Sequence, residues 1–153
     1  MLHNSHQQRL IINRCWLIYD LITEKFRHLY EFHIEFPALV ELASISCYLQ
    51  ILEEISPEGY FLHIHEEYDF GEHRLQLKGY SYNLLDKSKH NIIRADSLPH
   101  HRVDYKGHEL SHFPDHLHDE KGRICSFTGK IEDFVKRASE IIKSEAQDSC
   151  TSS

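Results

Sequence analysis

The sequence predicts an α+β domain with an N-terminal helix, a five-stranded antiparallel sheet meander, a long histidine-rich loop and a C-terminal helix. Three observations predict it. Apolar residues recur at helical spacing near both ends of the chain, and between these ends they alternate with polar residues. Short connections join the alternating segments, which favours antiparallel pairing of neighbours. We expect a single domain over residues 1–144 and a polar, disordered tail over 145–153.

Two segments have the pattern of amphipathic helices. In the first, the apolar residues that fall on one helical face are Ile11, Cys15, Ile18, Ile22, Phe26 and Leu29. Near the C-terminus, Thr128 is suited to cap a second helix. The apolar stripe of this helix consists of Ile131, Phe134, Val135, Ala138, Ile141 and Ile142. Each stripe needs a surface to cover, so we expect both helices on one face of the sheet.

Five segments between the helices alternate as half-buried strands do. They cover residues 30–36, 43–51, 60–65, 75–82 and 91–96. Pro37 ends the first strand, because proline has no amide donor for the strand ladder. Residues 97–127 follow neither period, and a loop of this length in a compact domain is usually functional or disordered.

Composition excludes several classes of protein. The net charge of -7 argues against a general electrostatic grip on nucleic acid, although a local site for RNA or DNA stays open. No apolar run approaches the roughly 20 residues of a membrane span, and the N-terminus lacks the pattern of a secretory signal. The four cysteines form no C-x-x-C pair. We therefore expect a cytoplasmic protein with free thiols and no membrane contact.

Histidine is the unusual residue, because seven of the 14 lie between residues 90 and 118. Imidazole titrates near neutral pH, so histidines held at one phosphodiester could act as base and acid. We assign this role to His100, His101, His116 and His118, all expected in the loop, and we expect the two clusters to lie within about 10 Å of each other.

Other residues would assist these histidines. Arg94 would stabilise charge on the phosphate, and Asp96 would orient a histidine through a hydrogen bond. Substrate binding is assigned to Glu67, Tyr80, Tyr82 and His112, with the strand residues forming a polar floor beneath the loop.

Simpler interpretations stay open beside this one. A histidine-rich loop can be a solvated surface, a Tyr-x-Tyr pair often packs in a core, and Arg94 with Asp96 can form a surface ion pair. His116 and His118 point to the same side of an extended segment, and with His100 or His101 they could complete a three-ligand metal set. Their spacing fits no metal signature, so no metal ligand and no cofactor are assigned.

The motifs taken together resemble the TumE family, regarded as the toxin half of type II toxin–antitoxin pairs. The matching residues, within about residues 30–142, are Glu67-Tyr68, Tyr80-Ser81-Tyr82, Arg94-x-Asp96-x-x-Pro99-His100-His101 and Phe113-Pro114-x-His116-x-His118. This chain departs from the family pattern at Ala95, Ser97, Leu98 and Asp115. The resemblance implies a helix-turn-helix antitoxin as partner, and a homodimer is left open.

These observations lead to one hypothesis and two alternatives. The hypothesis is a growth-inhibiting toxin that acts on RNA, in its simplest form as a metal-independent ribonuclease. The first alternative is a non-enzymatic protein-binding module whose histidines form a metal or pH-sensitive clasp. The second is a metal-dependent hydrolase.

The tail provides a first test. Truncation after Lys143 should leave the melting temperature nearly unchanged, because the residues beyond it have no apolar period with which to dock on the domain. Thermal unfolding of both chains, followed by circular dichroism, measures the difference. A drop of many degrees would show that the tail packs on the domain.

Overall fold

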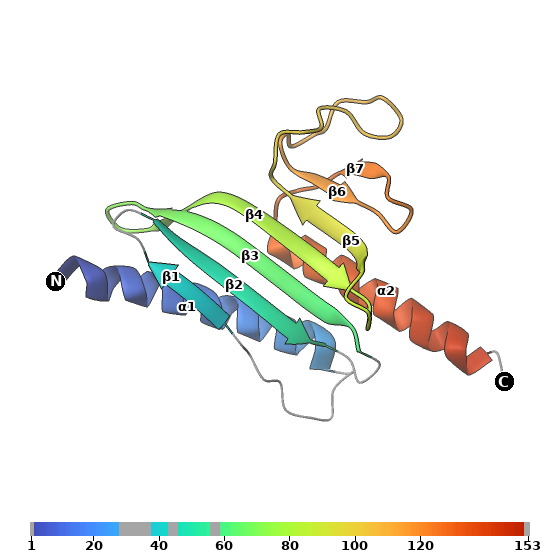
Figure 1. The fold of residues 1–153 in the computed structure, drawn as a ribbon, viewed down its shortest axis with the longest axis horizontal. Helices are drawn as coiled ribbons and strands as arrows, with labels where there is room; N and C mark the ends of the chain where they lie inside the picture. Colours follow the sequence, from blue (N-terminus) through green and yellow to red (C-terminus); the bar gives the residue numbers. More distant parts are fainter. Residues whose placement is uncertain (1, 28–37, 43–45, 56–58, 152–153) are drawn as a thin grey trace.

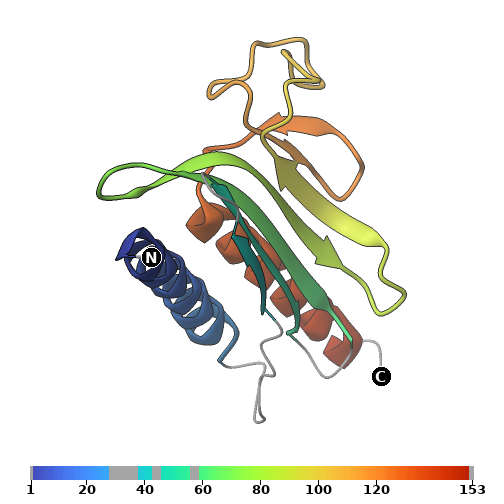
Figure 2. The ribbon, with the colours of Figure 1, turned by 60° about the vertical axis from the view of Figure 1, so that its left-hand side comes forward.

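Two helices and one sheet form two layers, with both helices against the same face of the sheet (Figures 1 and 2). The computed structural model describes residues 2–27, 38–42, 46–55 and 59–151. Helix α1 is Leu2–Phe26 and helix α2 is Ile131–Thr151. The strands are β1 Ala38–Leu42, β2 Ser46–Glu54, β3 Phe61–Phe70, β4 Leu75–Leu85, β5 Asn91–Asp96, β6 His116–His118 and β7 Ile124–Ser126. The predicted α+β class is confirmed.

The sheet is an antiparallel meander in which each strand pairs with its neighbour in sequence. Strands β3, β4 and β5 match predicted strands, and β2 overlaps the predicted strand 43–51. The predicted strand 30–36 lies outside the described residues. Strand β1 begins directly after Pro37 and was not predicted. Strands β6 and β7 extend the sheet from the segment that was expected to be a loop.

A tight turn joins β6 to β7 and explains why the chain returns to the sheet. The buried carboxylate of Asp119 accepts hydrogen bonds from the amides of Lys121 and Arg123, at 2.9 and 2.8 Å. Gly122 has a φ of 74°, which glycine adopts without strain. Each strand has three residues, too few for alternation to be visible in the sequence.

The main core fills the space between the helices and the sheet. The predicted apolar stripes supply it from both helices: Ile18, Ile22 and Phe26 from α1, and Ile131, Phe134, Val135, Ala138 and Ile142 from α2. The sheet contributes Leu62, Ile64, Tyr80, Tyr82, Leu84, Ile93, Ala95 and Leu117. Each of these sheet residues faces the helices, so His63, His65 and Glu67, which alternate with buried residues of β3, lie on the opposite face.

A β-bulge interrupts the pairing of β3 with β4. Glu67 lies opposite Gly79, and Tyr68 lies opposite Leu77, so Lys78 is an extra residue in β4. One extra residue exchanges the two faces of a strand.

The bulge corrects the expectation for Tyr80 and Tyr82. Both were expected on a polar floor, but they lie on the helix-covered face, with 6% and 0% of their surface exposed. Their rings stack with centroids 4.5 Å apart, and the Tyr82 ring packs against Phe134. They are core residues and do not form the expected polar floor beneath the loop.

One charged group is buried among these apolar residues. Glu66 of β3 is fully buried, and its carboxylate accepts two hydrogen bonds from Arg14 of α1, at 2.9 and 2.8 Å. The hydroxyls of Tyr68 and Tyr82 donate to the same carboxylate, each at 2.7 Å. This fully paired network joins α1 to the centre of the sheet.

The C-terminal tail differs from expectation. Helix α2 continues to Thr151, so most of the segment expected to be disordered is helical. Among the described residues, neither helix combines the length and apolar character that crossing a membrane requires. Cys15 and Cys125 are free thiols, whereas the side chains of Cys47 and Cys150 lie outside the described part of the chain.

The Arg14–Glu66 pair gives a test of the fold. Arg14→Met should destabilise the protein by about 3–5 kcal/mol, because it leaves a buried carboxylate without its cation. The double variant Arg14→Met/Glu66→Leu should recover part of this loss, since no buried charge remains. Urea unfolding measures all three proteins. A single variant as stable as wild type would contradict the network.

Candidate functional site

The face of the sheet opposite the helices carries two rows of polar residues that cross β3, β4, β5 and β6. The strand register aligns His65, Ser81, Asp96 and His116 in the first row, and His63, Asn83, Arg94 and His118 in the second. Neighbouring strands lie about 4.8 Å apart, so each row extends over roughly 14 Å. Three histidines meet at the β6 end of these rows.

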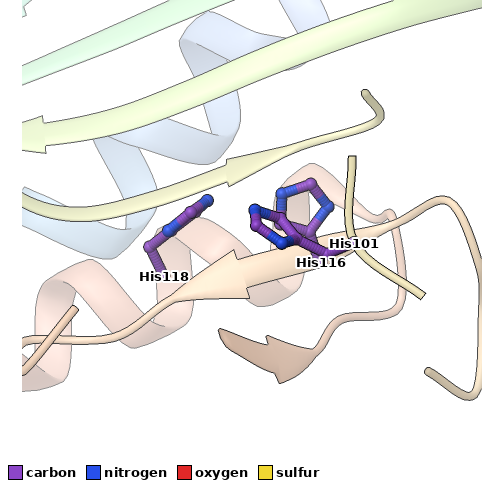
Figure 3. A group of neighbouring side chains, drawn as sticks. All are labelled: His101, His116 and His118. Atoms are coloured by element: carbon purple, nitrogen blue, oxygen red, sulfur yellow. The ribbon is translucent and has the colours of Figure 1, made fainter. Parts of the chain in front are cut away.

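The three histidines are His101, His116 and His118, which we call the histidine centre. His116 and His118 project from β6, and His101 reaches them from the preceding loop (Figure 3). The ring centroids are 5.0 Å apart for His101 and His116, 5.6 Å for His101 and His118, and 5.1 Å for His116 and His118. The expected meeting of the two clusters is therefore confirmed. One ring nitrogen from each residue lies within 4.8 Å of the others.

His116 is the fixed member of the centre. It was expected in a loop, but it lies in β6 with 0% of its surface exposed. Its Nδ1 lies 3.0 Å from the carbonyl oxygen of Pro114, which can only accept a hydrogen bond. Nδ1 therefore carries a proton, and in the neutral ring Nε2 presents a lone pair. Among the described residues, Nε2 has no hydrogen-bond partner.

Asp96 and Arg94 lie beside the centre on β5. Asp96 is 2% exposed, and its Oδ1 lies 3.4 Å from Nε2 of His116 without forming a hydrogen bond. Oδ1 of Asp96 also accepts a hydrogen bond from the backbone amide of Leu98, and Oδ2 accepts one from Nε of Arg94. Both hydrogen bonds are 3.0 Å long. The Arg94 side chain is 38% exposed, so an anion in solution can bind to it. Asp96 thus places a negative charge against a buried ring nitrogen.

Two imidazoles of the open face, those of His63 and His118, have lowered pKa values. Partial burial lowers the pKa of His118, and the nearby His116 lowers it further. Burial and the neighbouring His65 similarly lower the pKa of His63. Neutral imidazoles keep a lone pair that can accept a proton or bind a cation.

Several predicted site residues lie away from the centre. His100 and His112 are exposed, and the ring of His100 is 6.1 Å from that of His101, outside the group of three. Glu67 lies on the open face, but on β3, where it contacts His65 at 3.3 Å. Of the proposed catalytic residues, the structure thus brings together three histidines with Arg94 and Asp96.

Two departures from the family pattern also lie away from the centre. Ala95 is fully buried on the helix-covered face. Asp115 accepts the hydroxyl of Tyr80 at 2.7 Å, and a Cβ at Gly129 would come within 2.9 Å of its carboxylate. Both residues therefore contribute to packing, and neither belongs to the group of three ring nitrogens.

Sequence reasoning missed part of the open face. His63 and Ser81 were not assigned a role, nor were His65 and Asn83, although all four occupy the two rows. The signal was available, because His63 and His65 alternate with Leu62 and Ile64 and so face away from the core. What the sequence could not give is the register that aligns them with Arg94 and Asp96.

The arrangement of these side chains permits two kinds of chemistry. Half-buried His101 and His118 can exchange protons with a bound molecule, while Arg94 can bind a phosphate through its terminal nitrogens. Alternatively, the three ring nitrogens can bind a cation.

Comparisons of the chain with protein-family models, with curated proteins and with solved structures found no match.

The different burial of the histidines gives a test. His116→Ala should destabilise the protein by about 1–3 kcal/mol, because it removes a buried ring and leaves the Asp96 carboxylate facing a cavity. His101→Ala, at a half-buried loop position, should cost less than about 1 kcal/mol. Urea unfolding compares the two variants. Equal stability of the His116→Ala and His101→Ala proteins would contradict the difference in burial between the two histidines.

Proposed function

We propose that this chain is a growth-inhibiting toxin that cleaves RNA at the histidine centre. The observation that carries the proposal is the convergence of three imidazoles with Arg94 and Asp96 on an open sheet face. Cleavage of a phosphodiester needs groups that move protons and a cation that stabilises charge on the phosphate, and these residues supply both. The biological role rests on the motifs that resemble the TumE family.

The open face offers a path for an RNA strand. The two rows lead from His63 and His65 to the histidine centre, and they provide donors and acceptors from histidine, serine and asparagine side chains. With a net charge of -7, the chain is unsuited to a grip on long RNA by charge alone. Recognition would therefore depend on contacts with a short single-stranded segment.

The chemistry can be written for RNA without a metal ion. One half-buried imidazole takes the proton of a ribose 2′-hydroxyl, and the 2′-oxygen attacks the adjacent phosphorus. The bond from phosphorus to the 5′-oxygen breaks, and a second imidazole donates a proton to that oxygen. The products are a 2′,3′-cyclic phosphate and a 5′-hydroxyl. Arg94 binds the phosphate oxygens as their charge increases.

A protein-binding module is the second candidate, and one observation favours it. Ile12, Trp16 and Leu17 of α1 are large apolar residues with 52%, 60% and 62% of their surface exposed. Exposed apolar residues gathered on one element are typical of protein contact surfaces. The proposed partner, a helix-turn-helix antitoxin, is compatible with either candidate.

Expression in bacteria tests the proposal. Wild-type protein should slow growth and fragment cellular RNA, whereas His101→Ala should relieve both effects, because losing a proton-transfer group lowers the rate by about 10²–10⁴-fold. His100→Ala is the matched control, since it changes the neighbouring histidine outside the centre and should stay toxic. Circular dichroism checks that the variants are folded.

Each other outcome has a definite meaning. A folded His101→Ala protein that cleaves RNA and slows growth as wild type does would disprove the role of the centre. Toxicity without RNA cleavage would favour the protein-binding module. A wild-type protein that neither slows growth nor cleaves RNA would disprove the proposal.

A further inference from the structure

We propose that His101, His116 and His118 form a binding site for a divalent transition-metal ion of the zinc class. The site is inferred from side-chain geometry and does not depend on the substrate. Only its link to RNA cleavage rests on the proposed function.

The first support is the donor set. Each of the three histidines offers one ring nitrogen, and these nitrogens lie within 4.8 Å of one another. In a tetrahedral zinc site with bonds of about 2.0–2.1 Å, ligand atoms are roughly 3.4 Å apart. Closing the difference takes shifts of about 1 Å, which rotation of the half-buried His101 and His118 rings can provide. Neutral imidazole is a preferred ligand of zinc and its neighbours in the first transition row.

The second support is the state of His116. Metal-binding histidines usually donate their other ring nitrogen to a backbone carbonyl or a carboxylate, which fixes the ring and its tautomer. His116 has this arrangement, because its Nδ1 donates to the Pro114 carbonyl and leaves Nε2 as the nitrogen available to an ion. Nε2 is buried, and it has no hydrogen-bond partner among the described residues. Burying a polar atom without a partner is unfavourable, and a cation would supply the missing partner.

The third support is electrostatic. Oδ1 of Asp96 lies 3.4 Å from Nε2 of His116, with the carboxylate almost completely buried. A divalent ion bound by the three nitrogens would be attracted by the negative charge of Asp96. Arg94 holds the other carboxylate oxygen and keeps Asp96 in place.

Three protein ligands leave a coordination position for water or a phosphate oxygen, as in catalytic zinc sites. With the ion bound, the imidazole lone pairs are used for coordination. The ion would then supply Lewis-acid chemistry at the phosphate in place of proton transfer by these imidazoles. In that form, RNA cleavage by this chain would be sensitive to chelators.

Cobalt binding provides the test, and it needs no RNA. The full-length protein is stripped with a chelator and titrated with Co²⁺, which absorbs visible light strongly in four-coordinate nitrogen sites and weakly in water. We expect strong absorption that saturates near one ion per chain and is displaced by Zn²⁺. Zn²⁺ at about 100 times its Kd should raise the Tm by roughly 5–10 °C.

The variants separate this site from the other histidines. His101→Ala and His118→Ala should weaken binding by more than about 100-fold, beyond the 10–100-fold typical of losing a residue outside the first coordination sphere. His100→Ala and His112→Ala, which change exposed histidines of the same loop, should bind as wild type does. His116→Ala is avoided because this residue also supports the fold.

The outcomes distinguish the two proposals. Weak, water-like Co²⁺ absorption in the wild type, or equal binding by wild type and His101→Ala, would overturn the metal site. RNA cleavage that persists in such a protein would leave the proposed function intact. Tight, His101-dependent metal binding without RNA cleavage would support the metal site and count against the proposed function.

Discussion

The histidine centre depends on the pairing of β6 with β5. Three residue pairs, Arg94 with His118, Ala95 with Leu117 and Asp96 with His116, determine which side chains meet. A shift of one residue would turn His116 and His118 toward the core and bring Leu117 to the open face. The pairing is held by Leu117, which packs in the core, and by the turn at Asp119 that joins β6 to β7. Packing on one face thus determines which polar side chains meet on the other.

The two faces of the sheet treat buried polar groups differently. On the helix-covered face, Glu66 is buried with four hydrogen bonds from Arg14, Tyr68 and Tyr82. On the open face, His116 is buried equally well, yet its Nε2 lacks a hydrogen-bond partner within the described part of the chain. Its nearest charged group is the carboxylate of Asp96, with Oδ1 at 3.4 Å from Nε2. The contrast is the structural basis of the metal site proposed above.

The sequence predicted the features that depend on local periodicity. The helical stripes identified the buried residues of α1 and α2, because a 3.6-residue period directly sets which side faces the core. Tyr80 and Tyr82 of β4 were predicted on the wrong face. The bulge at Lys78 exchanges the two faces of the strand, and the sequence alone does not show where a bulge occurs. Strands β6 and β7 were missed because a three-residue strand has no period of its own. The meeting of His101 with His116 followed from the chemistry that such clusters serve, but the choice of His101 over His100 depends on the path of the loop.

The position of Asp115 has a consequence for how relatives of this chain should be compared. Its carboxylate lies between the hydroxyl of Tyr80 and the backbone of Gly129, at the start of α2. Evolution at position 115 should therefore be coupled to positions 80 and 129, and a change at one should be accompanied by compensating changes at the others. In an alignment, these columns would record how the second helix is anchored to the sheet. Diversity in them would carry information about packing, separate from the columns of the histidine centre.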